Sequence, residues 1–190
     1  MANENLGGGS SDGLTIEQIV ADYLAVIYRF VFRLVGNEAD ATDVTQEVMV
    51  KVWKNLGKYD SRQDLKPWLF KIARNTAIDW LRKRRQIPFS QLDRWDEEGR
   101  DLSFADTLAD LELLPNEVFA QKEVKTQFDR ALTTLPINER TIVAMHLEEE
   151  LTFVEIAEIV DRPLNTVKSA YRRALIKLRK ELDKLAPKAS

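Results

Sequence analysis

The stretch that decides the fold of this chain is LTFVEIAEIVDRPLNTVKSAYRRALIKLRKEL, Leu151 to Leu182. Thr152 followed by Glu155 forms a capping-box signal, which predicts the start of a short helix. The segment DRPLN predicts a tight turn, because Pro163 cannot continue a helix. Asn165 is then predicted to cap a second helix, which is rich in lysine and arginine. A short helix, a brief turn and a cationic second helix together indicate a helix-turn-helix, a motif typical of DNA-binding domains.

The second helix of this motif has an apolar side and a cationic side. The apolar positions predicted to be buried are Val167, Ala170, Ala174, Leu175 and Leu178. The first turns of a recognition helix face the base edges of the major groove, where arginine and lysine donate to guanine or neutralise phosphates. The candidate DNA contacts are therefore Asn165, Thr166, Lys168, Ser169, Arg172 and Arg173. The alternative is a helical hairpin whose basic face is only solvated.

A second informative stretch is NEADATDVTQEVMVKVW, Asn37 to Trp53. Helical spacing predicts a buried stripe of Ala41, Val44, Val48 and Val52. The opposite face is predicted to be exposed and acidic, and it comprises Asp40, Asp43, Gln46 and Glu47. Thr42 lies on this face as a neutral hydroxyl among acids, whereas Thr45 lies toward the apolar side.

A third stretch, KPWLFKIARNTAIDWLRKRR, combines cations with aromatic residues and an amide. Pro67 suits the first turn of a helix, and the predicted apolar stripe is Trp68, Ile72, Ile78 and Leu81. Aromatic faces, cations and an amide are also suited to single-stranded DNA. The aromatic residues are predicted to belong mainly to the core. The candidate binding residues are Arg74, Asn75 and the cluster Arg82–Arg85.

Charge is unevenly distributed along the 190 residues. The net charge is −3, but residues 87–114 carry eight acids against two arginines, which leaves the rest of the chain positive. This pattern indicates basic binding surfaces joined by an acidic linker.

Several classes of protein do not fit the composition. The chain has no cysteine, which excludes disulfides and thiolate metal sites, and it has no glycine-rich phosphate loop. The single histidine, His146, lies near apolar positions and is predicted to be a satisfied, partly buried side chain. We therefore expect no enzyme, no metal and no cofactor. The N-terminal residues lack the features of a signal peptide and no run is long enough to span a membrane, so we expect a cytoplasmic protein.

Turn and cap signals predict an all-α fold of two small helical domains joined by the acidic linker. Thr15 opens the first helix and Gly36 closes it, while Asn138 is predicted to cap a helix in the second domain. The predicted divisions are a flexible tail (1–13), a first domain (14–86), the linker (87–114), a second domain (115–186) and a short tail (187–190).

The order of these stretches resembles the extracytoplasmic-function sigma factors of bacterial RNA polymerase, from about Thr15 to Leu185. The resemblance implies a region 2 domain that opens and reads the −10 promoter element, and a region 4 domain that reads the −35 element. It also implies that Asp40, Asp43, Gln46 and Glu47 dock on the β′ clamp helices, and that region 4 meets the β flap. It adds Leu65 and Lys71 to Arg74, Asn75, Arg82, Arg84 and Arg85 as −10 contacts.

The sequence departs from the family pattern at Thr42, where an acid is usual. We hypothesise that a Ser/Thr kinase phosphorylates Thr42, with Thr45 as second choice, and so restores the missing charge. The further partners expected are core RNA polymerase, promoter DNA and an anti-sigma factor. The alternative function is a stand-alone helix-turn-helix regulator that binds duplex operators without polymerase.

Overall fold

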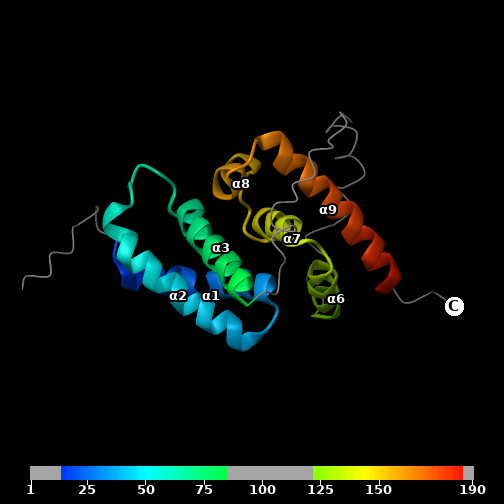
Figure 1. Ribbon diagram of the computed structural model, residues 1–190, viewed down its shortest axis with the longest axis horizontal. Helices are drawn as coiled ribbons and strands as arrows, with labels where there is room; N and C mark the ends of the chain where they lie inside the picture. Colours follow the sequence, from blue (N-terminus) through cyan, green and yellow to red (C-terminus); the bar gives the residue numbers. More distant parts are fainter. Residues whose placement is uncertain (1–13, 85–121, 186–190) are drawn as a thin grey trace, which may run out of the picture. The chain divides into compact units, whose positions relative to one another are not determined.

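The computed structural model describes residues 14–84 and 122–185, which form helices and turns with no strand in either range (Figure 1). The chain forms two compact units that divide near the C-terminal end of α3 (Leu65–Lys83). The all-α, two-domain architecture predicted from the sequence is confirmed. Several predictions concern residues outside the described ranges: both tails, Arg85, the acidic linker and the start of the second domain at Pro115.

The first unit begins with two helices that pack along each other, α1 (Ile16–Val35) and α2 (Glu38–Asn55). The hydroxyl of Thr15 accepts a hydrogen bond from the backbone of Gln18, so Thr15 is the N-cap as predicted. Gly36 ends α1 at φ 87°, a left-handed conformation that glycine adopts without strain. A 3₁₀ turn, η1 (Leu56–Lys58), follows α2 and leads toward α3.

The core of the first unit joins α3 to α1. The rings of Phe70 and Phe30 meet edge to face with centroids 4.9 Å apart. The prediction for α3 was wrong in part, because Trp68 and Ile72 are only half-buried. Trp68 instead packs against Tyr59 of the preceding loop, with centroids 5.0 Å apart. The buried side of α3 is formed by Leu69, Phe70, Ala73, Ala77, Ile78 and Leu81.

The second unit contains α6 (Lys122–Thr133), α7 (Ile137–Val143), a π-helical turn η3 (Ala144–Glu148), α8 (Phe153–Val160) and α9 (Leu164–Leu185). Asn138 does not cap α7, contrary to the prediction. The carbonyl of Pro136 accepts from Arg140 N at 2.9 Å, so the helix starts two residues earlier, at Ile137, and Asn138 is buried inside it.

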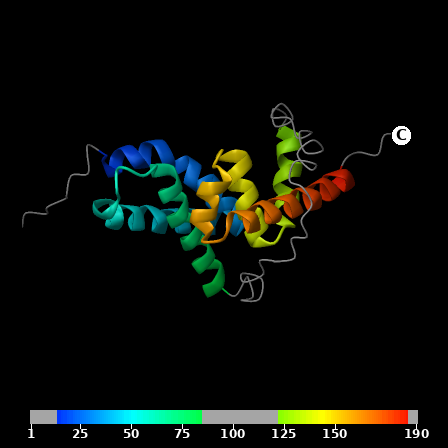
Figure 2. The ribbon, with the colours of Figure 1, turned by 90° about the horizontal axis from the view of Figure 1, so that it is seen from above.

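The longest helix, α9, packs against α6, α7 and α8 and is unbroken in both views (Figures 1 and 2). The predicted capping box opens α8: Thr152 Oγ1 accepts from Glu155 N, and Glu155 Oε2 accepts from Thr152 N at 2.7 Å. Asp161 ends α8 in a left-handed conformation at φ 54°. The helix-turn-helix predicted from the sequence is therefore present, with α9 as its second helix.

Candidate functional site

The cationic face of α9 is held outward by the burial of the opposite face. Val167, Ala170, Ala174 and Leu178 are almost fully buried, as predicted. Asn165 is not the N-cap, which corrects the prediction. The carbonyl of Pro163 accepts from Val167 N at 3.1 Å, so α9 begins at Leu164 and Asn165 lies exposed in its first turn.

The candidate DNA contacts on α9 differ in how they are held. Asn165 is exposed, whereas Thr166, Lys168, Ser169 and Arg172 are half-buried. Arg172 makes no ion pair or hydrogen bond within residues 14–84 and 122–185. Arg173 differs because its Nε lies 3.8 Å from Oε1 of Glu139 on α7. Arg172 is thus the arginine that the protein leaves available to an external anion.

Three aromatic rings, one each from η3, α8 and α9, pack together. His146 stacks on Phe153 with centroids 4.1 Å apart, and Tyr171 packs edge-on against both rings. His146 Nδ1 lies 2.8 Å from the carbonyl oxygen of Leu151, so the prediction of a satisfied structural histidine is confirmed. Tyr171 is a core residue that the sequence analysis did not place in the core. Burial raises its pKa to about 12.

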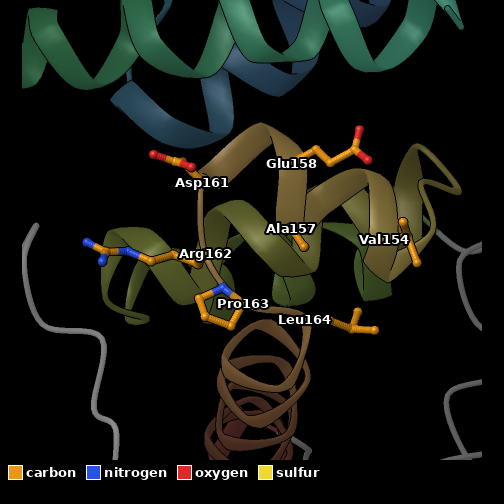
Figure 3. Close-up of a pocket in the computed structure, with 7 residues that line it drawn as sticks. All are labelled: Val154, Ala157, Glu158, Asp161, Arg162, Pro163 and Leu164. Atoms are coloured by element: carbon orange, nitrogen blue, oxygen red, sulfur yellow. The ribbon is translucent and has the colours of Figure 1, made fainter.

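A shallow hollow of about 400 Å³ lies beside the turn between α8 and α9 (Figure 3). Glu158, Asp161 and Arg162 contribute its charges, and Val154, which also lines it, is 56% exposed. Two carboxylates and one guanidinium are a poor match for phosphates. The hollow is therefore a weaker candidate for DNA contact than the cationic face of α9.

The exposed face of α2 carries fewer available carboxylates than the sequence predicted. Asp40 is only 6% exposed, so its placement on the exposed face was wrong. Its Oδ2 accepts from Asn37 Nδ2 at 2.8 Å, and its backbone N–H donates to Asn37 Oδ1 at 2.9 Å. Asp40 therefore helps to start the helix. Glu47 is partly neutralised, because Lys51 Nζ lies 2.9 Å from its Oε1.

The exposed side of α2 continues into apolar residues that the sequence analysis missed. Val50 and Trp53 are 47% and 62% exposed. They follow Gln46 at spacings of four and three residues, so all three share one helix face. That spacing could have identified them, since large apolar side chains at exposed helix positions often mark binding surfaces. We call Asp43, Gln46, Glu47, Val50 and Trp53 the α2 docking face.

The two candidate phosphorylation sites on α2 have opposite environments. Thr42 is exposed, and its hydroxyl donates to the carbonyl of Glu38 at 2.9 Å. Thr45 is buried, as predicted, and its hydroxyl has no hydrogen-bond partner within the described ranges. A kinase therefore has access to Thr42 and not to Thr45 in the folded protein.

The candidate −10 residues lie along α3, and the structure places one of them in a defined orientation. Arg74 Nη1 donates to Asn75 Oδ1 at 2.9 Å, which leaves the amide N–H₂ of the exposed Asn75 directed to other partners. Leu65 is half-buried, and Lys71, Arg82 and Arg84 are exposed. Exposed cations around an oriented amide suit a single strand with an unstacked base.

The described residues show no features of a metal site or a membrane span. Neither described range contains a cluster of three or more histidine and acidic side chains able to hold a metal ion. No helix in those ranges is both long enough and apolar enough to cross a bilayer. The features that remain are the cationic face of α9, the oriented amide on α3 and the α2 docking face.

Comparison with protein families matches each unit to a different region of one kind of protein. The family Sigma-70 region 2 matches residues 19–87, and the family Sigma-70, region 4 matches residues 125–178. The sigma factor RpoE of Bartonella quintana, solved in complex with the anti-sigma factor NepR, has a similar fold. Its TM-score is 0.65 at 22% sequence identity, over 88% of this chain and 96% of that chain.

Curated relatives agree over most of the chain. The ECF RNA polymerase sigma factor SigW of Bacillus subtilis is 30% identical over 164 residues, which cover 86% of this chain and 87% of the relative. The RNA polymerase sigma factor SigV of the same organism is 31% identical over 167 residues, covering 87% and 89%. The family expected from the sequence is thereby confirmed, and with it a role in transcription initiation and not in catalysis. This chain belongs to the extracytoplasmic-function sigma factors of RNA polymerase.

Proposed function

We propose that three separate faces of this sigma factor divide its work: α9 reads the −35 element, α3 holds the opened −10 strand, and the α2 docking face binds core RNA polymerase. The observation that supports this division best is the contrast along α9. One side is buried in the unit, and the other carries Arg172 with no protein partner among the described residues. An arginine left in this way on the second helix of a helix-turn-helix suits a guanine edge or a phosphate.

The role of α3 depends on Asn75. Arg74 fixes the amide oxygen, so the amide N–H₂ is the group that can donate to a base. The Watson–Crick edge of a base is accessible to such a donor only after the base has left its pair in the duplex. Lys71, Arg82 and Arg84 supply exposed cations for the backbone of the same strand. Leu65, at the start of α3, is the apolar candidate for contact with the same DNA strand.

The role of the α2 docking face follows from its mixed chemistry. Asp43 and Glu47 offer carboxylates to a cationic partner, and Val50 and Trp53 offer apolar area. Interfaces typically combine a central aromatic anchor with a polar rim. The family resemblance implies the β′ clamp helices of core polymerase as the partner.

Thr42 is the proposed point of control on this face. Asp40 points inward and Glu47 is paired with Lys51, so Asp43 is the one acid of the predicted set that is both exposed and without an ion pair among the described residues. A phosphate on the neighbouring Thr42 would add about −1.5 to −2 charge and three acceptor oxygens. A Ser/Thr kinase would then switch on polymerase binding.

Two further expectations follow from the family. The RpoE structure contains an anti-sigma factor, and we extend an anti-sigma partner to this chain. A protein that works with RNA polymerase on the chromosome acts in the bacterial cytoplasm, which is where we place it.

Run-off transcription with purified core RNA polymerase on genomic fragments tests the proposed function. We expect specific transcripts only when this protein is added. A stand-alone regulator would instead bind an operator duplex tightly by itself and give no transcript with core enzyme. That result would refute the proposal, and it would favour the alternative derived from the helix-turn-helix alone.

A further inference from the structure

Glu139, on α7, is a buried carboxylate that faces the DNA-binding helix α9. The residue is only 5% exposed. Lys177 Nζ donates to both of its oxygens at 2.8 Å, and Arg173 Nε lies 3.8 Å from Oε1. A buried carboxylate needs such partners, because an unpaired charge in the interior is costly. The carboxylate therefore connects α7 to two cations of α9.

The position of Glu139 determines which edge of Arg173 can meet DNA. Arg173 Nε is buried and makes no hydrogen bond within the described residues, and its 3.8 Å separation from the carboxylate is an ion pair beyond hydrogen-bonding distance. The side chain as a whole remains 26% exposed. With the Nε edge turned into the protein, the two Nη groups are the donors left for an external partner.

The inward Nε edge limits how Arg173 can recognise a base. Arginine reads guanine through two parallel N–H donors, which reach O6 and N7. A guanidinium with its Nε edge held inward can offer only its two Nη groups, in one orientation. A guanidinium that rotates freely can also pair with phosphates through either edge, and phosphates carry no sequence information.

We propose that Glu139 is a positioning residue that holds the Nε edge of Arg173 inward and thereby sets base preference in the −35 element. The inference rests on the proposed role of α9. It goes further by assigning specificity to a buried acid that does not itself contact DNA.

The competing explanation is that Glu139 only stabilises the unit. Both hydrogen bonds to its carboxylate come from Lys177, so a purely structural effect should be reproduced by removing that lysine. Lys177→Gln is therefore the matched control, since it removes the bonded cation and leaves the pair between Glu139 and Arg173 in place.

The experiment measures base preference with the complete holoenzyme. A promoter fragment that the parent holoenzyme binds is randomised in its upstream element, and the bound duplexes are sequenced. We expect Glu139→Gln to lower the preference at one position by about 5- to 10-fold, within the range of one bidentate base contact. Arg173→Ala should affect the same position. Adding Glu139→Gln to Arg173→Ala should change nothing further, and Lys177→Gln should keep the parental preference.

Two different results would contradict two different claims. Glu139 is not a positioning residue if Arg173→Ala reduces the base preference and Glu139→Gln does not. The same conclusion holds if Glu139→Gln reduces the preference by the same factor whether residue 173 is arginine or alanine. If Arg173→Ala leaves every position unchanged, the prediction from the sequence that Arg173 contacts DNA is itself wrong, whereas the proposed role of α9 still depends on Arg172. Circular dichroism checks that each variant is helical. Should Glu139→Gln fail to fold, Glu139→Asp makes the same comparison, because it keeps the charge and draws the carboxylate back by one methylene.

Discussion

Phosphorylation of Thr42 should strengthen binding to core RNA polymerase by about 5- to 100-fold. A phosphate that gains one charge-assisted hydrogen bond contributes about 1.5–3 kcal/mol. The site is exposed and the carboxylate of Glu38 lies one turn earlier, so like-charge repulsion of about 0.2–0.5 kcal/mol acts against this gain. Thr42 is the fifth residue of α2, beyond the first turn, so the helix dipole adds little. The net of about 1.0–2.8 kcal/mol corresponds to about 5- to 100-fold in affinity.

Fluorescence titration of core enzyme with four samples measures this effect: unmodified protein, kinase-treated protein, Thr42→Ala and kinase-treated Thr42→Ala. We expect a gain in affinity only in the kinase-treated parent. Thr45→Val is the matched control, because it removes the second candidate hydroxyl from the same helix and should leave the gain intact. Equal affinity of the unmodified and phosphorylated proteins would refute the switch. Thr42→Glu alone would not decide the question, since glutamate carries less charge than phosphate.

Three further predictions concern residues that the structure singled out. Trp53→Ala should weaken binding to core polymerase by at least about 10-fold, because it removes an aromatic interface anchor. It should change the free energy of unfolding by less than about 0.5 kcal/mol, because the side chain is exposed. Leu24→Ala, at an exposed site of α1, is the control and should leave the affinity unchanged. The pKa of Tyr171 is raised from 10.0 to about 12, so its stabilising contribution is complete below pH 10 and is lost as pH rises toward 12. Between pH 9 and pH 11, the free energy of unfolding measured with urea should therefore fall by roughly 1 kcal/mol more in the parent than in Tyr171→Phe. An equal fall in both proteins would contradict the burial argument. Glu150 has φ 55°, a left-handed conformation that disfavours glutamate, so Glu150→Gly should raise the free energy of unfolding by about 0.5–1 kcal/mol. Asp161→Gly should gain less, because aspartate tolerates this conformation better; a loss of stability in Glu150→Gly would contradict the reasoning.

The elements that depend on local signals could be predicted from the sequence. The capping box at Thr152 and Glu155 predicted the first residue of α8, and apolar spacing predicted the buried side of α9. Both signals involve residues within a few positions of each other, so they are readable without the tertiary structure.

The errors arose where two local solutions compete or where partners are distant in sequence. Asn165 and Asn138 are good capping residues, but in each case the helix starts from a proline two positions earlier. Asp40 was expected on the surface, and its hydrogen bonds to Asn37 hold it inward. The contact of Glu139 with Lys177 spans 38 residues, so no local pattern could reveal it.

The measurement that tests the central claim most directly is a pair of footprints on one promoter, made with the same holoenzyme. DNase protection reports the −35 contact, and permanganate reactivity of thymines reports −10 opening. We expect Arg172→Ala to weaken upstream protection, and Asn75→Ala to keep that protection while losing thymine reactivity. Upstream protection unchanged by Arg172→Ala, together with full thymine reactivity in Asn75→Ala, would contradict the division of promoter recognition between α9 and α3.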